Sequence, residues 1–134
     1  MEVGSVIFEV VHDTTPPKPK FYIVVGHTSD CLIIAALYIN TEINQNVFPT
    51  QQLRDLHVLI TENDNPFLKY DSFVDCSGIH EKQTSRVMQT LQSGSSEYGY
   101  YGCVAPADMG RIINKIKSAH TISPITKRKF GFIQ

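Results

Sequence analysis

The sequence KFYIVVGHTSDCLIIAALYI, residues 20–39, contains two apolar runs separated by a short polar segment. The runs, Lys20–Val25 and Cys31–Ile39, are rich in the β-branched and aromatic residues that favour strands. With Gly26–Asp30 between them, the pattern predicts a β-hairpin. The longest apolar run, Cys31–Leu37, is far shorter than the roughly 20 residues that a membrane-spanning helix needs.

Further strands are expected on both sides of this hairpin. Val6–Val11 precedes it, and Leu56–Ile60, Ser72–Cys76 and Tyr100–Val104 follow it as shorter runs. The segment His12–Pro19 is expected to be a loop, because its three prolines cannot donate to a sheet ladder.

Two helices are expected in the second half of the chain. The first spans Lys82–Gln92 and is followed by Gly94, which suits a helix end. The second begins at Pro106, a residue well tolerated in a first turn. Four of its apolar residues have the spacing of a buried helical stripe: Met109, Ile112, Ile113 and Ile116.

Strands that come first and helices that come later favour an α+β domain, with a small antiparallel sheet or barrel and helices packed on one side. The 134 residues fit one domain, 1–134, with a basic C-terminal tail at 120–134. With 42% hydrophobic and 19% charged residues, the composition excludes a disordered chain. The N-terminus shows no export signal, and three widely spaced cysteines predict free, buried thiols in the cytoplasm.

The net charge of −1 conceals an uneven distribution. Residues 1–110 hold all 13 acids and 6 bases, whereas residues 111–134 hold 6 bases and no acid. These six bases form either a phosphate-facing patch or a solvated helix face with a tail that pairs with the acidic body. They are Arg111, Lys115, Lys117, Lys127, Arg128 and Lys129.

Several common sites are absent from the sequence. There is no G-x-G-x-x-G, G-x-x-x-x-G-K-[ST], H-E-x-x-H or G-x-S-x-G motif, so no cofactor is expected. No two histidines share a metal-ligand spacing, so no metal site is expected either.

The loop between the first two strands is the first candidate for chemistry, because it carries His12, Asp13, Lys18 and Lys20 on a backbone stiffened by prolines. RNA cleavage needs a base for the 2′-hydroxyl, a cation for the phosphorane and an acid for the leaving oxygen. The alternative is a hairpin connection with solvated charges.

Three other segments are weaker candidates. Asn40 and Thr41, at the end of the Cys31–Ile39 run, either bind a phosphate or base edge or form a turn. The segment Tyr70–His80 contains Asp75 and His80, whose spacing favours structural use. The aromatic cluster Tyr98–Gly102 either stacks bases or packs in the core.

Taken in order, these segments resemble the MazF/PemK toxin group of toxin–antitoxin systems. The matching segments are Gly4–Val10, Lys18–Val25, Leu37–Thr41, Tyr70–Cys76, and Tyr101–Val104 with the following helix Asp108–Ala119. The resemblance implies a small SH3-like barrel, usually dimeric, that cleaves single-stranded RNA without a metal and is blocked by an antitoxin.

Carried over by position, Lys18 stands where the group has Arg, and Thr41 stands where it has Thr or Ser. Lysine lacks the bidentate fork of arginine. The leading hypothesis is an RNA-cleaving toxin in which Lys18 or Lys20 stabilises the phosphorane, Thr41 orients the phosphate, and His12 or Asp13 handles protons.

In this hypothesis the RNA is bound by Asn40 and by five of the C-terminal bases: Arg111, Lys115, Lys127, Arg128 and Lys129. The alternative is a non-catalytic module of the same fold that binds nucleic acid or a protein. A third possibility, an enzyme of another class, has no motif to support it.

Overall fold

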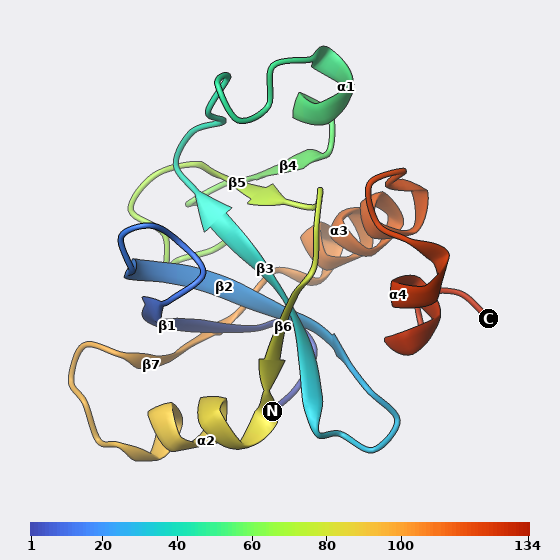
Figure 1. Cartoon of the computed structure of the whole chain (residues 1–134). Helices are drawn as coiled ribbons and strands as arrows, with labels where there is room; N and C mark the ends of the chain where they lie inside the picture. The colour runs from blue at the N-terminus through green and yellow to red at the C-terminus, as the bar shows by residue number, and fades with distance from the viewer.

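The computed structural model describes residues 1–134, which form a seven-stranded antiparallel sheet with four helices (Figure 1). The strands are β1 (Ser5–Val11), β2 (Lys18–His27), β3 (Ile33–Asn40), β4 (His57–Ile60), β5 (Ser72–Asp75), β6 (His80–Gln83) and β7 (Gly99–Cys103). The helices are α1 (Gln51–Arg54), α2 (Thr84–Gln92), α3 (Pro106–Ser118) and α4 (Pro124–Lys129). The α+β class and the antiparallel sheet are therefore confirmed.

The sheet is organised around β3. One edge of β3 pairs with β2 in the expected hairpin, with Tyr22 opposite Tyr38. The other edge pairs with β6 over Ile33–Ala36 and with β5 at Ile39 and Asn40. The strand order β4-β5-β3-β2-β1-β7 leaves two separate ends, so the sheet does not close into a barrel.

Both faces of the central strands are apolar. In the larger core, Ile23 and Leu37 pack with Ile112 and Ile116 of α3. In the smaller core, alternate residues of the same strands pack with Val87 of α2. The expectation of helices on one side only is therefore wrong, since two apolar faces each need a cover.

Most expected elements are present, with shifted ends. The helix expected from Lys82 begins at Thr84, because the preceding residues pair with β3 as β6. On the expected α3 stripe, Ile112 and Ile116 are buried, whereas Met109 and Ile113 are partly buried against the larger core. All three cysteines are free, but only Cys76 is buried; Cys31 and Cys103 are exposed, contrary to the expectation.

The C-terminal segment, residues 120–134, is part of the folded domain rather than a tail. Ser123 caps α4 by accepting a hydrogen bond from the backbone N–H of Thr126. Phe130 and Phe132 are buried in the larger core. They approach β2 at Gly26, where a Cβ atom would lie 3.3 Å from the Phe130 carbonyl oxygen.

No helix of the chain has both the length and the apolar character needed to cross a bilayer.

Replacing Phe132 with alanine should therefore lower the free energy of unfolding by roughly 3–5 kcal/mol, because a buried ring leaves a cavity. The matched control is Ile125→Ala in the same segment, whose side chain is exposed (77%) and should change stability by less than about 0.5 kcal/mol. Urea denaturation measures both. Equal effects of the two substitutions would mean that the C-terminal segment does not anchor the fold.

Candidate functional site

The β1–β2 loop meets β6 over the side chain of Tyr38. The Tyr38 hydroxyl donates to Asp13 Oδ1 at 2.6 Å, and His80 Nδ1 lies 2.8 Å from Asp13 Oδ2. The His80 ring stacks on the Tyr38 ring, with centroids 3.8 Å apart. Because a carboxylate only accepts hydrogen bonds, this contact assigns the proton to Nδ1 and leaves Nε2 as a free acceptor in the neutral ring. We call Asp13, Tyr38, His80 and Lys82 the Asp13–His80 network.

Two lysines bring positive charge to this face of the sheet. Lys82 Nζ donates to the Tyr38 hydroxyl at 3.1 Å and lies 4.8 Å from the centre of the Tyr22 ring. Lys20 donates to the side-chain oxygen of Asn40. Partial burial lowers the pKa of both amines, and the charge of Lys18 lowers that of Lys20 further. These ammonium groups are thus less solvated than surface lysines.

Asp13 is held in its ionised form. Desolvation works to raise its pKa, but the hydrogen bond from Tyr38 and the charge and hydrogen bond of His80 outweigh it, so the pKa lies below the ordinary value. Burial and the bond to Asp13 raise the pKa of Tyr38, which therefore stays a donor. Asp13 can orient the imidazole, but it cannot supply a proton near neutral pH.

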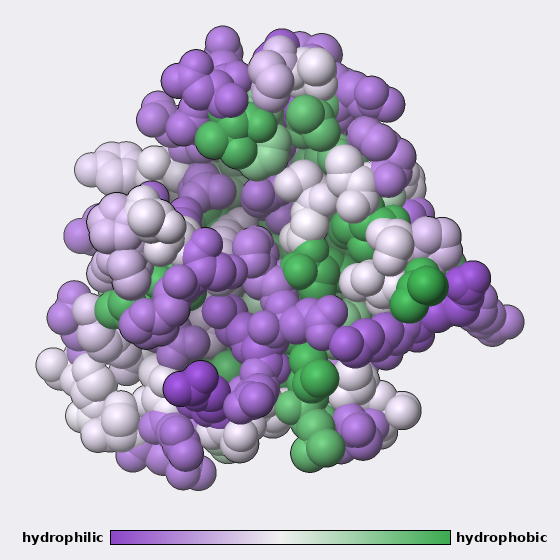
Figure 2. Space-filling model, in the orientation of Figure 1, coloured by the Kyte–Doolittle hydropathy of each residue, from purple (hydrophilic) through white to green (hydrophobic).

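A cavity of about 730 Å³ opens beside this network, between β1, the β1–β2 loop and α2. His12, Asp13, Lys82 and Arg86 contribute polar groups to its lining. Its inner wall is fixed by Glu9, which accepts from the hydroxyls of Tyr22 (2.5 Å) and Thr90 (2.6 Å). Figure 2 shows hydrophilic atoms across the centre of this face, where Figure 1 places β6.

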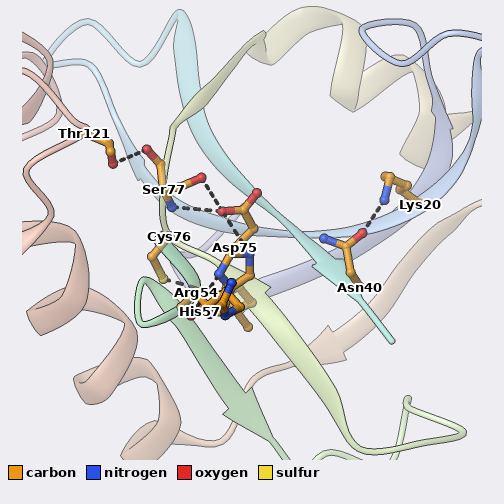
Figure 3. A network of polar contacts seen from close by, with 9 residues as sticks. Lys20, Asn40, Arg54, His57, Asp75, Cys76, Ser77 and Thr121 are labelled. Atoms are coloured by element: carbon orange, nitrogen blue, oxygen red, sulfur yellow. Dashed lines mark hydrogen bonds and ion pairs between the residues drawn. The ribbon is translucent and has the colours of Figure 1, made fainter. Parts of the chain in front are cut away.

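A second polar cluster lies where β4 and β5 pair (Figure 3). His57 is almost fully buried, with Nδ1 3.2 Å from the Arg54 carbonyl oxygen and Nε2 3.6 Å from Asp75 Oδ1. Asp75 also accepts from the N–H and hydroxyl of Ser77. Its carboxylate is close enough to favour the charged form of Lys20. These contacts tie α1 to the sheet and hold Asp75 beside the cations.

The structure brings some of the predicted site residues together. Lys18, Lys20 and Asn40 lie on the sheet face that carries Tyr38, because β2 and β3 pair Tyr22 with Tyr38 and side chains alternate along each strand. His12 is exposed at the cavity, and Thr41 is exposed just after β3. Lys18 and Pro19 belong to β2 rather than to the expected loop.

Asp75 and His80, the two candidates within the segment Tyr70–His80, do not pair with each other. Asp75 is bonded by Ser77 and approached by His57, whereas His80 pairs with Asp13. The aromatic cluster also has a packing role, because Tyr101 lies 5.2 Å from the ring centre of Phe21. Tyr100, by contrast, remains largely exposed.

The C-terminal bases make contacts with several different elements. Arg111 pairs with Asp108 on α3 and bonds the Leu59 carbonyl oxygen on β4. Lys127 bonds the Lys117 carbonyl oxygen, and Lys129 pairs with Glu81 on β6. Lys115, on α3, lines a groove beside β4, and Arg128 is exposed. Arg111 and Lys129 therefore pair with acids of residues 1–110, in line with the alternative in which the C-terminal bases pair with the acidic body.

Sequence reasoning did not select Tyr38 or Lys82, and it considered His80 only beside Asp75, with a structural use favoured. The available signal was the alternation in HEKQ, residues 80–83, where His80 and Lys82 fall two positions apart and hence on one face of a strand. Assigning Lys82 to a helix removed that signal. The partners of these residues come from the β1–β2 loop, far away in the sequence.

A scan against protein-family models and a search of curated proteins each find no match to the chain. No group of three or more His, Cys, Asp or Glu side chains is arranged to hold a metal ion. The site is therefore interpreted from its own geometry.

The lowered pKa of Asp13 predicts a pH-dependent contribution to stability. The ionised carboxylate stabilises the fold above its ordinary pKa of 3.8, and this contribution is lost as the pH falls through the lowered folded-state value. Asp13→Asn should thus be less stable than the wild type at about pH 7.5, and the difference should shrink at about pH 2.5. Urea denaturation at both pH values measures it. A difference that is the same at both would contradict the assigned contacts.

Proposed function

We propose that the protein is a metal-independent endoribonuclease of the MazF/PemK type, acting on single-stranded RNA in the cytoplasm. The observation that carries the proposal is the Asp13–His80 network, in which Asp13 orients the His80 imidazole while Asp13 and Lys82 line an open cavity. The MazF/PemK resemblance supplies the substrate class. It also implies an SH3-like arrangement of the curved sheet, a homodimer and an antitoxin partner.

The proposed reaction is an internal transesterification. Nε2 of His80 takes the proton of a ribose 2′-hydroxyl, and the 2′-oxygen forms a bond to the adjacent phosphorus. The bond from phosphorus to the 5′-oxygen breaks, and His12 protonates that oxygen. The products are a 2′,3′-cyclic phosphate and a 5′-hydroxyl end.

The other residues of the face support this step. Lys82 and Lys20 stabilise the extra negative charge of the phosphorane, and their partial burial strengthens that interaction. Asp13 acts through His80 by fixing its tautomer, so it is a positioning residue rather than the proton donor. Thr41 and Asn40, at the end of β3, orient the scissile phosphate.

One observation favours the alternative, a module that binds single-stranded RNA or a protein without cleaving. Lys18, at the position of the toxin group's arginine, is exposed, and no hydrogen bond holds its ammonium group. A lysine whose ammonium group makes no hydrogen bond provides charge for binding but not the fixed geometry that transition-state stabilisation needs. The assay below separates binding from cleavage.

Purified protein should cleave a mixture of long single-stranded RNAs in excess EDTA and leave 5′-hydroxyl ends. His80→Gln should slow cleavage by at least about 100-fold, the effect of losing a general base. The matched control is His120→Gln, an exposed histidine outside the network, which should cleave at the wild-type rate. Gel analysis and end-labelling measure rate and product ends.

Three results would count against this proposal. Activity that disappears in EDTA and returns with magnesium would remove the mechanism, and full activity of His80→Gln would remove the general base. RNA binding without cleavage, seen as a rise in fluorescence anisotropy, would instead support the binding module.

Expression of the protein without a partner should slow bacterial growth, because free ribonuclease activity degrades messenger RNA. The double substitution Lys18→Ala with Thr41→Ala should relieve the effect, since these residues match the toxin group's motif positions. Lys69→Ala, at an exposed position in the β4–β5 loop, is the control and should remain toxic. Colony counts at matched soluble expression decide the outcome; normal growth with the wild-type chain would contradict the toxin hypothesis.

A further inference from the structure

β4 has an open edge, because it pairs only with β5. The backbone N–H of Cys76 donates to the Leu56 carbonyl oxygen at 3.0 Å, which fixes the alternation of the ladder. The N–H and C=O groups of His57 and Leu59 consequently point away from β5. The bond from Arg111 to the Leu59 carbonyl oxygen, 2.7 Å long, agrees with this direction.

A groove of about 410 Å³ runs between this open edge and α3. It combines the outward backbone groups of β4 with polar side chains of the helix. Its lining includes His57, Leu59, Arg111, Asn114, Lys115 and Ser118. Two of these side chains are cationic and none is acidic; because Arg111 pairs with Asp108 behind the groove, Lys115 supplies its unpaired positive charge.

We propose that this groove binds an extended acidic peptide, which adds as a further strand to β4. Outward backbone groups at alternate residues match the hydrogen-bonding repeat of an extended chain. The side chains of such a peptide that face α3 lie beside Arg111 and Lys115, and these pair with carboxylates.

Arg111 acts as a cover for the edge in the free protein. Its guanidinium occupies the Leu59 carbonyl oxygen, an acceptor that the incoming strand needs. Native proteins commonly protect open strand edges with charged side chains. The Arg111 side chain is 53% exposed, and its contacts with Leu59 and Asp108 both use Nη2, so other N–H groups of the guanidinium remain for a peptide carboxylate.

A nucleic acid is the less suitable occupant of this groove. Phosphates are recognised by cations and do not need paired donors and acceptors at the strand repeat. The outward groups of His57 and Leu59 satisfy a peptide backbone, which offers both donors and acceptors. The inference does not rest on the proposed ribonuclease activity, because the Asp13–His80 network contributes no residue to the groove.

The probe is a fluorescein-labelled peptide of four Glu-Val repeats, titrated with the full chain and followed by fluorescence anisotropy. It should bind saturably, and Lys115→Glu should weaken binding at least tenfold. The matched control is Lys117→Glu, which changes the same charge on the same helix outside the groove and should alter the Kd less than about twofold. A peptide of four Lys-Val repeats should bind at least tenfold more weakly.

The backbone contacts are tested separately. Methylating alternate peptide nitrogens of the Glu-Val probe should abolish binding, and the unmodified probe should shift the backbone amide NMR signals of His57 and Leu59. Equal binding of the methylated probe, equal weakening by the two lysine substitutions, or no binding of any peptide would overturn the proposal. Displacement of the probe by a short single-stranded RNA, with shifts at the same amides, would also overturn it by identifying a phosphate site.

Discussion

The hydrogen bonding of β3 along both of its edges is the constraint that positions the other parts of the molecule. β2 occupies one edge, while β6 and β5 share the other. Because β5 and β6 are consecutive in the chain, the short segment between them runs beside the same edge of β3. This arrangement brings His80 beside Tyr38 and Asp75 to the end of β3 near Asn40, although β3 and β6 are about 40 residues apart.

Tyr38 connects the packing of the sheet with the chemistry of its face. Its ring is buried in the smaller core with Tyr22 and Val87. Its hydroxyl reaches Asp13 and Lys82, and its ring supports His80. The same strand alternation that buries Leu37 in the larger core therefore turns Tyr38 toward the site. A site built on a central strand is held more rigidly than one carried by loops alone.

The sequence alone predicts the elements with strong local patterns. The hairpin at residues 20–39 could be predicted because two continuous runs of β-branched and aromatic residues flank a short polar segment, and α3 because of its period-3.6 stripe. β6 could not, since its alternation is polar and its strand pairing is non-local. The two-sided sheet was missed for a related reason: Val87 of α2 and the Ile112–Ile116 stripe of α3 are both apolar, and nothing in either helix says which face of the sheet it covers.

The residues of the candidate site likewise divide into those that a local pattern could predict and those that depend on non-local strand pairing. Asp13 and Lys20 could be selected because residues 12–20 concentrate titratable side chains in a short stretch of sequence. His80 could not be paired with Asp13 without knowing that β6 lies next to β3. The C-terminal segment was expected to be a basic tail because it holds three bases and no acid, yet Phe130 and Phe132 anchor it in the core.

The central claim is that Asp13 fixes His80 with its proton on Nδ1 and leaves Nε2 free to accept a proton. Long-range proton–nitrogen NMR correlation on the uniformly nitrogen-labelled chain reports the tautomer of each neutral histidine ring directly. Measured at about pH 8.5, where imidazoles are generally neutral, His80 should be the Nδ1–H tautomer and should lose that preference in Asp13→Asn. A His80 ring protonated on Nε2, or one unaffected by Asp13→Asn, would contradict the account.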